Sequence, residues 1–148
     1  MKLKLLAIFL VLFSALATAQ QPTTNIELDL KNTEPTPLQT SEYATIWLEV
    51  TNNGTSTADN VEVEFTENYP FSVDPNEQTS WELGELVPGE EYQIRLEVRV
   101  DKNAVQGENE LNFQTSASPN IQIEKSIPVD VRSDNNILSV QNIQMNEF

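Results

Sequence analysis

The sequence of 148 residues predicts an all-β fold, an antiparallel β-sandwich of about seven strands that follows a short targeting segment. Three observations lead to this prediction. Apolar and polar residues alternate with period two through most of the chain after residue 19. Glycine, proline and asparagine separate the alternating runs. No segment after residue 19 has apolar residues at the 3.6-residue spacing of an amphipathic helix.

Residues 1–19 have the layout of a secretory signal peptide. Two lysines precede an unbroken apolar run, and Ala17-Thr18-Ala19 supplies a small-x-small cleavage pattern. We expect cleavage between Ala19 and Gln20. An uncleaved anchor is the competing interpretation, but the apolar stretch 5–19 is shorter than the ~20 residues that span a bilayer. The sequence therefore predicts a secreted or cell-surface protein that touches the membrane only through this signal or through an anchor outside this chain.

The clearest strand is "EEYQIRLEVRV", residues 90–100, in which every second residue from Tyr92 to Val100 is apolar. Successive strand side chains point to opposite faces, so this run has one buried face and one solvated face. Lys125 interrupts the last run, as a bulge or an edge position would. The other alternating positions, in chain order, are Ile26, Leu28, Leu30, Ala44, Ile46, Leu48, Val50, Val61, Val63, Phe65, Trp81, Leu83, Leu111, Phe113, Ile121, Ile123, Ile127, Val129 and Val131.

Turn-forming residues separate these runs. The four turn segments are Asn53-Gly54, Val87-Pro88-Gly89, Gln106-Gly107 and Ser118-Pro119-Asn120. Asn-Gly tolerates the positive φ of a tight hairpin turn, so a hairpin-type connection with Gly54 at positive φ is expected here. Trp81 shares the apolar spacing of Leu83 and is a core candidate. Trp47 lies on the opposite parity from its apolar neighbours, so an edge position is expected for it.

Two stretches resemble a known group of domains. "WLEVTNNGTSTADNVEVEF" (47–65) looks like the opening strand-turn-strand of Ig-like modules in archaeal and bacterial surface proteins, the cell-adhesion-related and S-layer-type domains. "WELGELVPGEEYQIRLEVRVDKNAVQGENEL" (81–111) resembles their next section, where a G-x-L-x-P-G-E turn opens a long strand. The resemblance implies an Ig-like sandwich over residues 20–133. It also implies an extracellular, non-catalytic spacer or adhesive module without shared catalytic residues.

Composition restricts the chemistry. The formal charge is −15, and loss of the signal makes it 6 − 23 = −17, which disfavours nucleic-acid partners. The chain has no cysteine and no histidine, so disulfides, Ser-His-Asp triads, Cys-His pairs and histidine-bound zinc are excluded within it. We therefore expect no enzyme activity, no cofactor and no metal centre.

Asn53-Gly54-Thr55 is an Asn-x-Ser/Thr triplet, which makes Asn53 the glycosylation candidate of an exported chain. Asn53 also suits a turn for backbone reasons, and the two interpretations are compatible. Asp74 and Asn76 are spaced faintly like a calcium loop, but the further oxygens and the glycine of such a loop are missing. Glu62 and Glu64 alternate with apolar residues, so they are expected to face solvent. A carboxylate pair for glycoside hydrolysis is disfavoured because a small sandwich leaves little room for a cleft.

Residues 134–148 follow the last alternating run and begin with a polar, linker-like stretch. They are interpreted as a linker with the start of a second module, as a donor strand for another subunit, or as a tail. Three functions follow: a spacer or adhesion module that contacts envelope proteins, neighbouring modules or a glycan; a filament subunit that assembles by strand exchange; and a secreted carbohydrate-associated domain.

Overall fold

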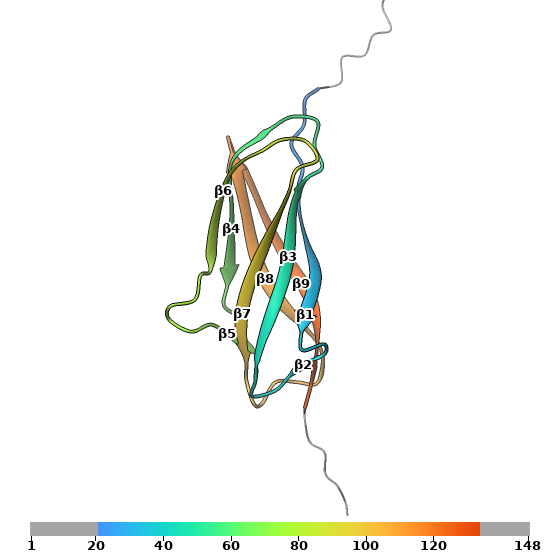
Figure 1. The fold of residues 1–148 in the computed structure, drawn as a ribbon, viewed down its shortest axis with the longest axis vertical. Coiled ribbons are helices and arrows are strands. Elements are labelled where there is room, and N and C mark those ends of the chain that lie inside the picture. Colours follow the sequence, from blue (N-terminus) through green and yellow to red (C-terminus); the bar gives the residue numbers. More distant parts are fainter. Residues whose placement is uncertain (1–20, 134–148) are drawn as a thin grey trace, which may run out of the picture.

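The computed structural model describes residues 21–133, which form two packed sheets and no helix (Figure 1). The predicted signal peptide, its cleavage site at Ala19 and Gln20, and the segment 134–148 lie outside the described residues. The strands are β1 (Ile26–Glu34), β2 (Leu38–Gln39), β3 (Tyr43–Asn52), β4 (Ala58–Thr66), β5 (Phe71–Ser72), β6 (Ser80–Leu86), β7 (Glu91–Val100), β8 (Gly107–Ser118) and β9 (Ile121–Arg132).

The two sheets have the orders β1-β3-β7-β5 and β2-β9-β8-β4-β6. All pairings are antiparallel except that of β2 with β9, which is parallel. The predicted all-β sandwich is confirmed. Seven strands have seven residues or more, as expected, and β2 and β5 are additional strands of two residues each. Strands this short show no alternation, so the sequence pattern does not reveal them.

The core lies between the sheets and consists largely of the alternating residues predicted from the sequence. Ile46, Leu48, Ile94 and Leu96 are completely or almost completely buried. Trp81 is 7% exposed and belongs to the core, whereas Trp47 is 36% exposed on the outer face of β3. The predicted edge position of Trp47 is wrong, because β3 pairs with both β1 and β7. Because each strand contributes every second residue, the inner faces of both sheets form one continuous apolar cluster.

Two predicted core residues are exposed. Tyr92 on β7 and Ile123 on β9 have the inner parity, yet they are 47% and 38% exposed. Two twisted sheets pack at an angle, so their corners diverge and the strand ends there lose the cover of the opposite sheet. Lys125 marks an edge, since β8 and β9 pair without a register shift and β9 has its second partner, β2, only at Val131 and Arg132.

The β6–β7 turn forms as predicted. Gly89 has φ +80°, and the Glu90 N–H donates to the Val87 carbonyl at 3.0 Å. The Glu90 carboxylate in turn accepts a hydrogen bond from the Val87 N–H at 2.9 Å. A residue with a side chain is strained at this φ, so glycine fits the position.

The described chain enters and leaves at opposite ends of the long axis (Figure 1). Residues 21–25 lie at the upper end in this view, beside the β3–β4 and β6–β7 loops. The last strand, β9, runs down the molecule and ends at the lower end beside β2.

Candidate functional site

The upper end of the sandwich is organised by a buried amide, the side chain of Asn52, which is 0% exposed. Its Nδ2 donates to the carbonyls of Ser56 and Leu86 at 2.9 and 2.8 Å. Its Oδ1 accepts from the Gly54 N–H at 2.9 Å and lies 3.5 Å from the Asn25 N–H. Both donor hydrogens and both acceptor positions are therefore used, so burial of this amide leaves no polar atom unpaired.

Sequence reasoning overlooked Asn52, although the signal was present. The inward positions of β3 are Ala44, Ile46, Leu48 and Val50, and the same alternation continues to Asn52. A polar residue on the core parity of a strand requires buried partners, and the loops at this end supply them.

The N-terminal lead, residues 23–25, docks on the β3–β4 connection. The N–H groups of Asn53 and Thr55 donate to the carbonyls of Asn25 and Thr23, each at 2.7 Å. The Thr23 N–H donates to Thr55 Oγ1 at 3.1 Å. The lead is therefore held to residues 53–55, before β1 begins, by two main-chain hydrogen bonds and one to a side chain.

The predicted hairpin-type turn at Asn53-Gly54 is wrong. β3 and β4 belong to different sheets, so residues 53–57 cross from one sheet to the other. Gly54 does not have a positive φ. Glycine is required there by close approach, since a Cβ at Gly54 would lie 2.3 Å from the Thr23 carbonyl oxygen and 2.8 Å from the Asn25 nitrogen.

Asn53 and Thr55, the first and third residues of the glycosylation triplet, are both exposed. The Asn53 side-chain amide donates to the Glu27 carboxylate. The acceptor asparagine therefore lies on the surface of the upper end, beside the first strand. Its glycosylation stays a prediction.

The acidic residues are largely spread over the surface. Asp74 is exposed, and its carboxylate oxygens accept from the Tyr43 hydroxyl at 3.2 Å each, which raises the pKa of Tyr43 through this hydrogen bond and through the Asp74 charge. Glu64 faces solvent, and Glu62 is half-buried and accepts from the Ser80 hydroxyl at 2.9 Å. Within residues 21–133, no group of three or more acidic side chains is arranged to hold a metal ion.

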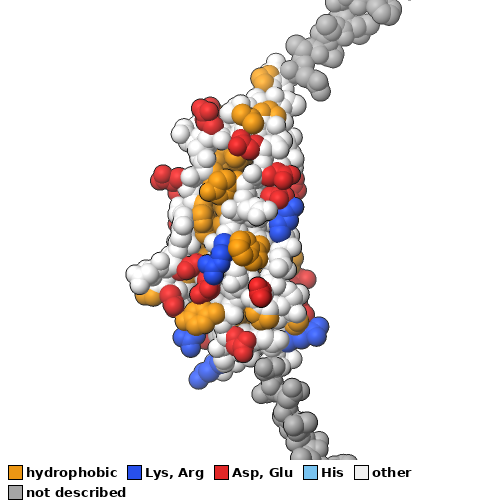
Figure 2. Space-filling model, viewed as in Figure 1, with side chains coloured by type: hydrophobic (Ala, Val, Ile, Leu, Met, Phe, Trp, Pro, Cys, Tyr) orange, Lys and Arg blue, Asp and Glu red, His pale blue; other side chains and the backbone are white. Residues whose placement is uncertain are grey.

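The outer face of the four-stranded sheet carries two exposed aromatic side chains, Tyr43 and Trp47, both on β3. The register places Trp47 between Arg95 of β7 and Asn32 of β1. Figure 2 shows acidic and basic side chains distributed over this side of the molecule, with a narrow run of hydrophobic side chains beside β7. This face offers an aromatic contact point within a mixed-charge surface.

One acidic side chain on this face is buried. Glu49 is 9% exposed and forms an ion pair with Lys31 of β1. The hydrogen bond from the ammonium to Glu49 raises the pKa of Lys31 above its ordinary value. The pair joins β1 to β3 on the outer face.

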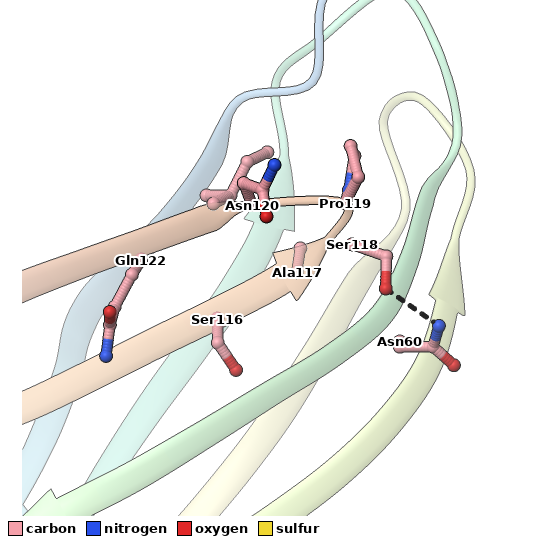
Figure 3. Close-up of a pocket in the computed structure, with 8 residues that line it drawn as sticks. Asn60, Ser116, Ala117, Ser118, Pro119, Asn120 and Gln122 are labelled. Atoms are coloured by element: carbon pink, nitrogen blue, oxygen red, sulfur yellow. Dashed lines mark hydrogen bonds between the residues drawn. The ribbon is translucent and has the colours of Figure 1, made fainter.

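A hollow of about 460 Å³ lies at the β8–β9 turn, around Asn60, Ser118 and Asn120 (Figure 3). The Asn60 Nδ2 donates to Ser118 Oγ at 2.9 Å across it. Its lining combines amides, hydroxyls and small apolar groups without an ionisable side chain. Such a lining can bind water or polar groups, and it has no base to activate a serine.

None of the residues from 21 to 133 is part of a helix that could cross a membrane.

Residues 25–126 match the model of the CARDB family. No curated protein matches the chain. Among solved structures, the chain is similar to the sporulation control protein Spo0M of Bacillus subtilis, with 15% identity, a TM-score of 0.44, and coverage of 74% of this chain and 49% of that one. It is also similar to a β-glucosidase of Erythrobacter marinus, with 14% identity, a TM-score of 0.34, and coverage of 74% and 16%. The chain thus spans less than two thirds of either protein.

CARDB is a non-catalytic, adhesion-type domain, and such domains occur in extracellular and surface proteins. The match spans more than half of the sequence and includes both stretches that resembled surface modules. The chain therefore belongs to the CARDB family of cell-adhesion-related, Ig-like surface modules.

Proposed function

We propose that this chain is a spacer or interaction module of an exported cell-surface protein, in line with neighbouring modules. The observation that carries the proposal is the position of its two ends, which leave the sandwich at opposite ends of the long axis (Figure 1). A module of this geometry adds its full length to a chain of modules. The membership in a family of surface modules supports the same role.

Its partners are neighbouring modules and other envelope proteins, with a glycan on Asn53 as a further surface element. Trp47, which is partly exposed beside Arg95, is the strongest contact point on the outer face of the four-stranded sheet. Aromatic and arginine side chains contribute most of the binding energy at protein interfaces. The acidic surface favours cationic partners over nucleic acids or anionic lipid headgroups.

Export and surface display are tested in the native host. Protease treatment of intact cells should release peptides of residues 21–133, and N-terminal mass spectrometry should find Gln20 at the start of the mature chain. Ala19→Arg should block cleavage at this bond and leave a larger form. Protection from external protease, or an intact Met1 on the mature chain, would contradict the proposal.

A filament subunit is a second candidate function because of the sheet edges. Among the described strands, β1 pairs only with β3, and β7 pairs beyond β3 only at Arg99 and Val100. A strand from another chain could add to either open edge. The Glu77 carboxylate covers one such position by accepting from the Glu97 N–H at 3.1 Å.

The two functions are separated by deletion of residues 134–148. A spacer should sediment as the same species with and without this segment. A filament whose donor strand lies in this segment should assemble as the concentration rises and should lose assembly on deletion, as followed by electron microscopy. Matched samples with Trp47→Ala report whether any assembly depends instead on the outer face of the four-stranded sheet.

A further inference from the structure

The first and last parts of the sandwich are joined directly to one another. β2 and β9 pair in parallel, with Leu38 opposite Val131 and Gln39 opposite Arg132. The Thr40 N–H extends the pairing by donating to the Arg132 carbonyl at 3.0 Å. Leu38 and Val131 are 1% and 0% exposed, so apolar packing adds to these main-chain bonds.

This pair lies between the two ends of the chain. The described chain enters at the upper end, runs down β1, crosses between the sheets in residues 35–37 and reaches β2 at the lower end (Figure 1). β9 ends at the lower end beside it. Tension applied to the two ends of the module therefore draws β2 upward and β9 downward, along their common direction.

Strands pulled in opposite directions along their length load their hydrogen bonds together, since these bonds run across the strands. Strands pulled apart from one end break the same bonds one after another. The parallel β2–β9 pair is loaded in the first way, as are the longer β1–β3 and β8–β9 pairings. Bonds that are loaded together resist a higher force than the same bonds broken one after another.

The segment from β1 to β2 also ties the two sheets to each other. β1 belongs to the four-stranded sheet and β2 to the five-stranded sheet. The Lys125 ammonium of β9 lies 3.2 Å from the Asp29 carboxylate of β1, which adds an ion pair on the same side of the sandwich. Rupture of the two-residue β2–β9 pair releases this segment from the five-stranded sheet.

We propose that the β2–β9 pair is a mechanical clamp, which keeps the module folded when tension acts between its ends. This inference rests on the proposed function as an in-line surface module, since only such a module is pulled from both ends. Force spectroscopy measures the clamp in the purified chain. Its failure would leave export and surface display untouched, and a failure of export would leave the measured force unchanged.

The absence of cysteine allows thiol handles at chosen positions of the chain that starts at Gln20. One pair, Gln21→Cys with Phe148→Cys, pulls from the two ends. A second pair, Gln21→Cys with Asn120→Cys, pulls from the lead and from the β8–β9 turn, so that neither the β2–β9 pair nor the β8–β9 pairing is loaded along its length. We expect an unfolding force at least twofold higher in the first geometry at equal pulling speed. Equal forces would overturn the proposal.

Two core substitutions provide a matched comparison. Leu38 in β2 and Phe71 in β5 are buried residues of two-residue strands, but β5 pairs with β7 and lies off the path between the ends. Leu38→Ala should lower the end-to-end force more than Phe71→Ala when both are compared at equal loss of stability in urea. Thr40→Pro, which removes the N–H that donates to Arg132 and leaves the buried Leu38 side chain in place, serves where Leu38→Ala does not fold. An equal loss of force in the β2 and β5 variants would contradict the clamp.

Discussion

The side-chain amide of Asn52 donates a hydrogen bond to the main-chain carbonyl of Leu86 at 2.8 Å, which joins the end of β3 to the end of β6 in the opposite sheet. The same residue bonds the β6–β7 turn through its backbone, where its N–H donates to the Glu90 carbonyl at 3.1 Å. One buried residue thus fixes the lead, the sheet-crossing loop and the β6–β7 turn relative to each other.

Asn52→Ala should destabilise the domain by about 3 kcal/mol, because the buried partners of the amide lose their hydrogen bonds and water does not reach them. Urea unfolding followed by tryptophan fluorescence measures the loss. The neighbouring exposed residue is the control, and Asn53→Ala should cost within about 0.5 kcal/mol. Similar losses for the two variants would show that the buried network contributes little.

Gly54→Val should destabilise the domain by roughly 1–3 kcal/mol, and Gly54→Ala should already be costly, since a Cβ meets main-chain atoms of the lead. The close approach also predicts a rescue. In a chain that starts at Ile26, the three atoms nearest to this Cβ are gone, and Gly54→Ala should become nearly neutral in thermal melts. A penalty that persists in the shortened chain would point to a conformational demand at Gly54.

Leu96→Ala should cost roughly 2–5 kcal/mol, because Leu96 is completely buried on β7. Arg95→Ala should cost within about 0.5 kcal/mol, since the Arg95 side chain is exposed and its ion pair with Glu97 lies at the surface. The two neighbours differ in the face they occupy, so chemical denaturation of both variants tests the alternation itself. Equal costs would contradict it.

The sequence pattern was sufficient for the main strands and for most of the core, because alternation reports which face of a strand is buried. It was misleading at Tyr92 and Ile123, where parity is inward but the opposite sheet provides too little cover. Parity tells on which face of its own strand a residue lies. Whether the opposite sheet buries that residue depends on how the two twisted sheets diverge. No local pattern contains that information.

The candidate site was predictable only in part. The Asn53 triplet was visible, but the role of Gly54 depends on residues 23–25, which lie about thirty positions earlier and contact it only in the fold. β2 was hidden for a related reason, as a two-residue strand is defined by its partner in β9. Contacts between distant segments follow from topology, and local sequence does not specify them.

At alkaline pH, the Tyr43–Asp74 contact should lose its contribution to stability. The hydrogen bond to Asp74 and the Asp74 charge raise the folded-state pKa of Tyr43 above 10.0. A pKa raised by folding stabilises the protein below the unfolded pKa, and the effect is lost as pH rises through the folded pKa. Tyr43→Phe should therefore lower the urea midpoint near neutral pH, and the two proteins should converge as pH rises through the raised pKa of Tyr43.

Lys31 has a raised pKa in the same pH range, because of its bond to Glu49, so it must be separated from Tyr43. Lys31→Met in both backgrounds removes the lysine titration and leaves the difference due to Tyr43. Absorbance of tyrosinate in the wild type and in Tyr43→Phe gives the pKa directly. A Tyr43 pKa at or below the ordinary tyrosine value would contradict the contact.

Asn53 should carry a glycan when the chain is exported by a host that modifies Asn-x-Ser/Thr triplets. The triplet needs a hydroxyl at its third position, so Thr55→Ala should abolish the modification, whereas Thr55→Ser should keep it. In the folded protein, the Asn53 amide bonds Glu27, and Thr55 Oγ1 accepts from the Thr23 N–H. Both groups are therefore engaged, and modification should be more complete on chains whose lead is not yet docked. A chain shortened to start at Ile26, behind the same signal, should therefore show a higher glycan occupancy of Asn53, as measured by intact-mass spectrometry. An unmodified Asn53 in both the full and the shortened chain would contradict the prediction.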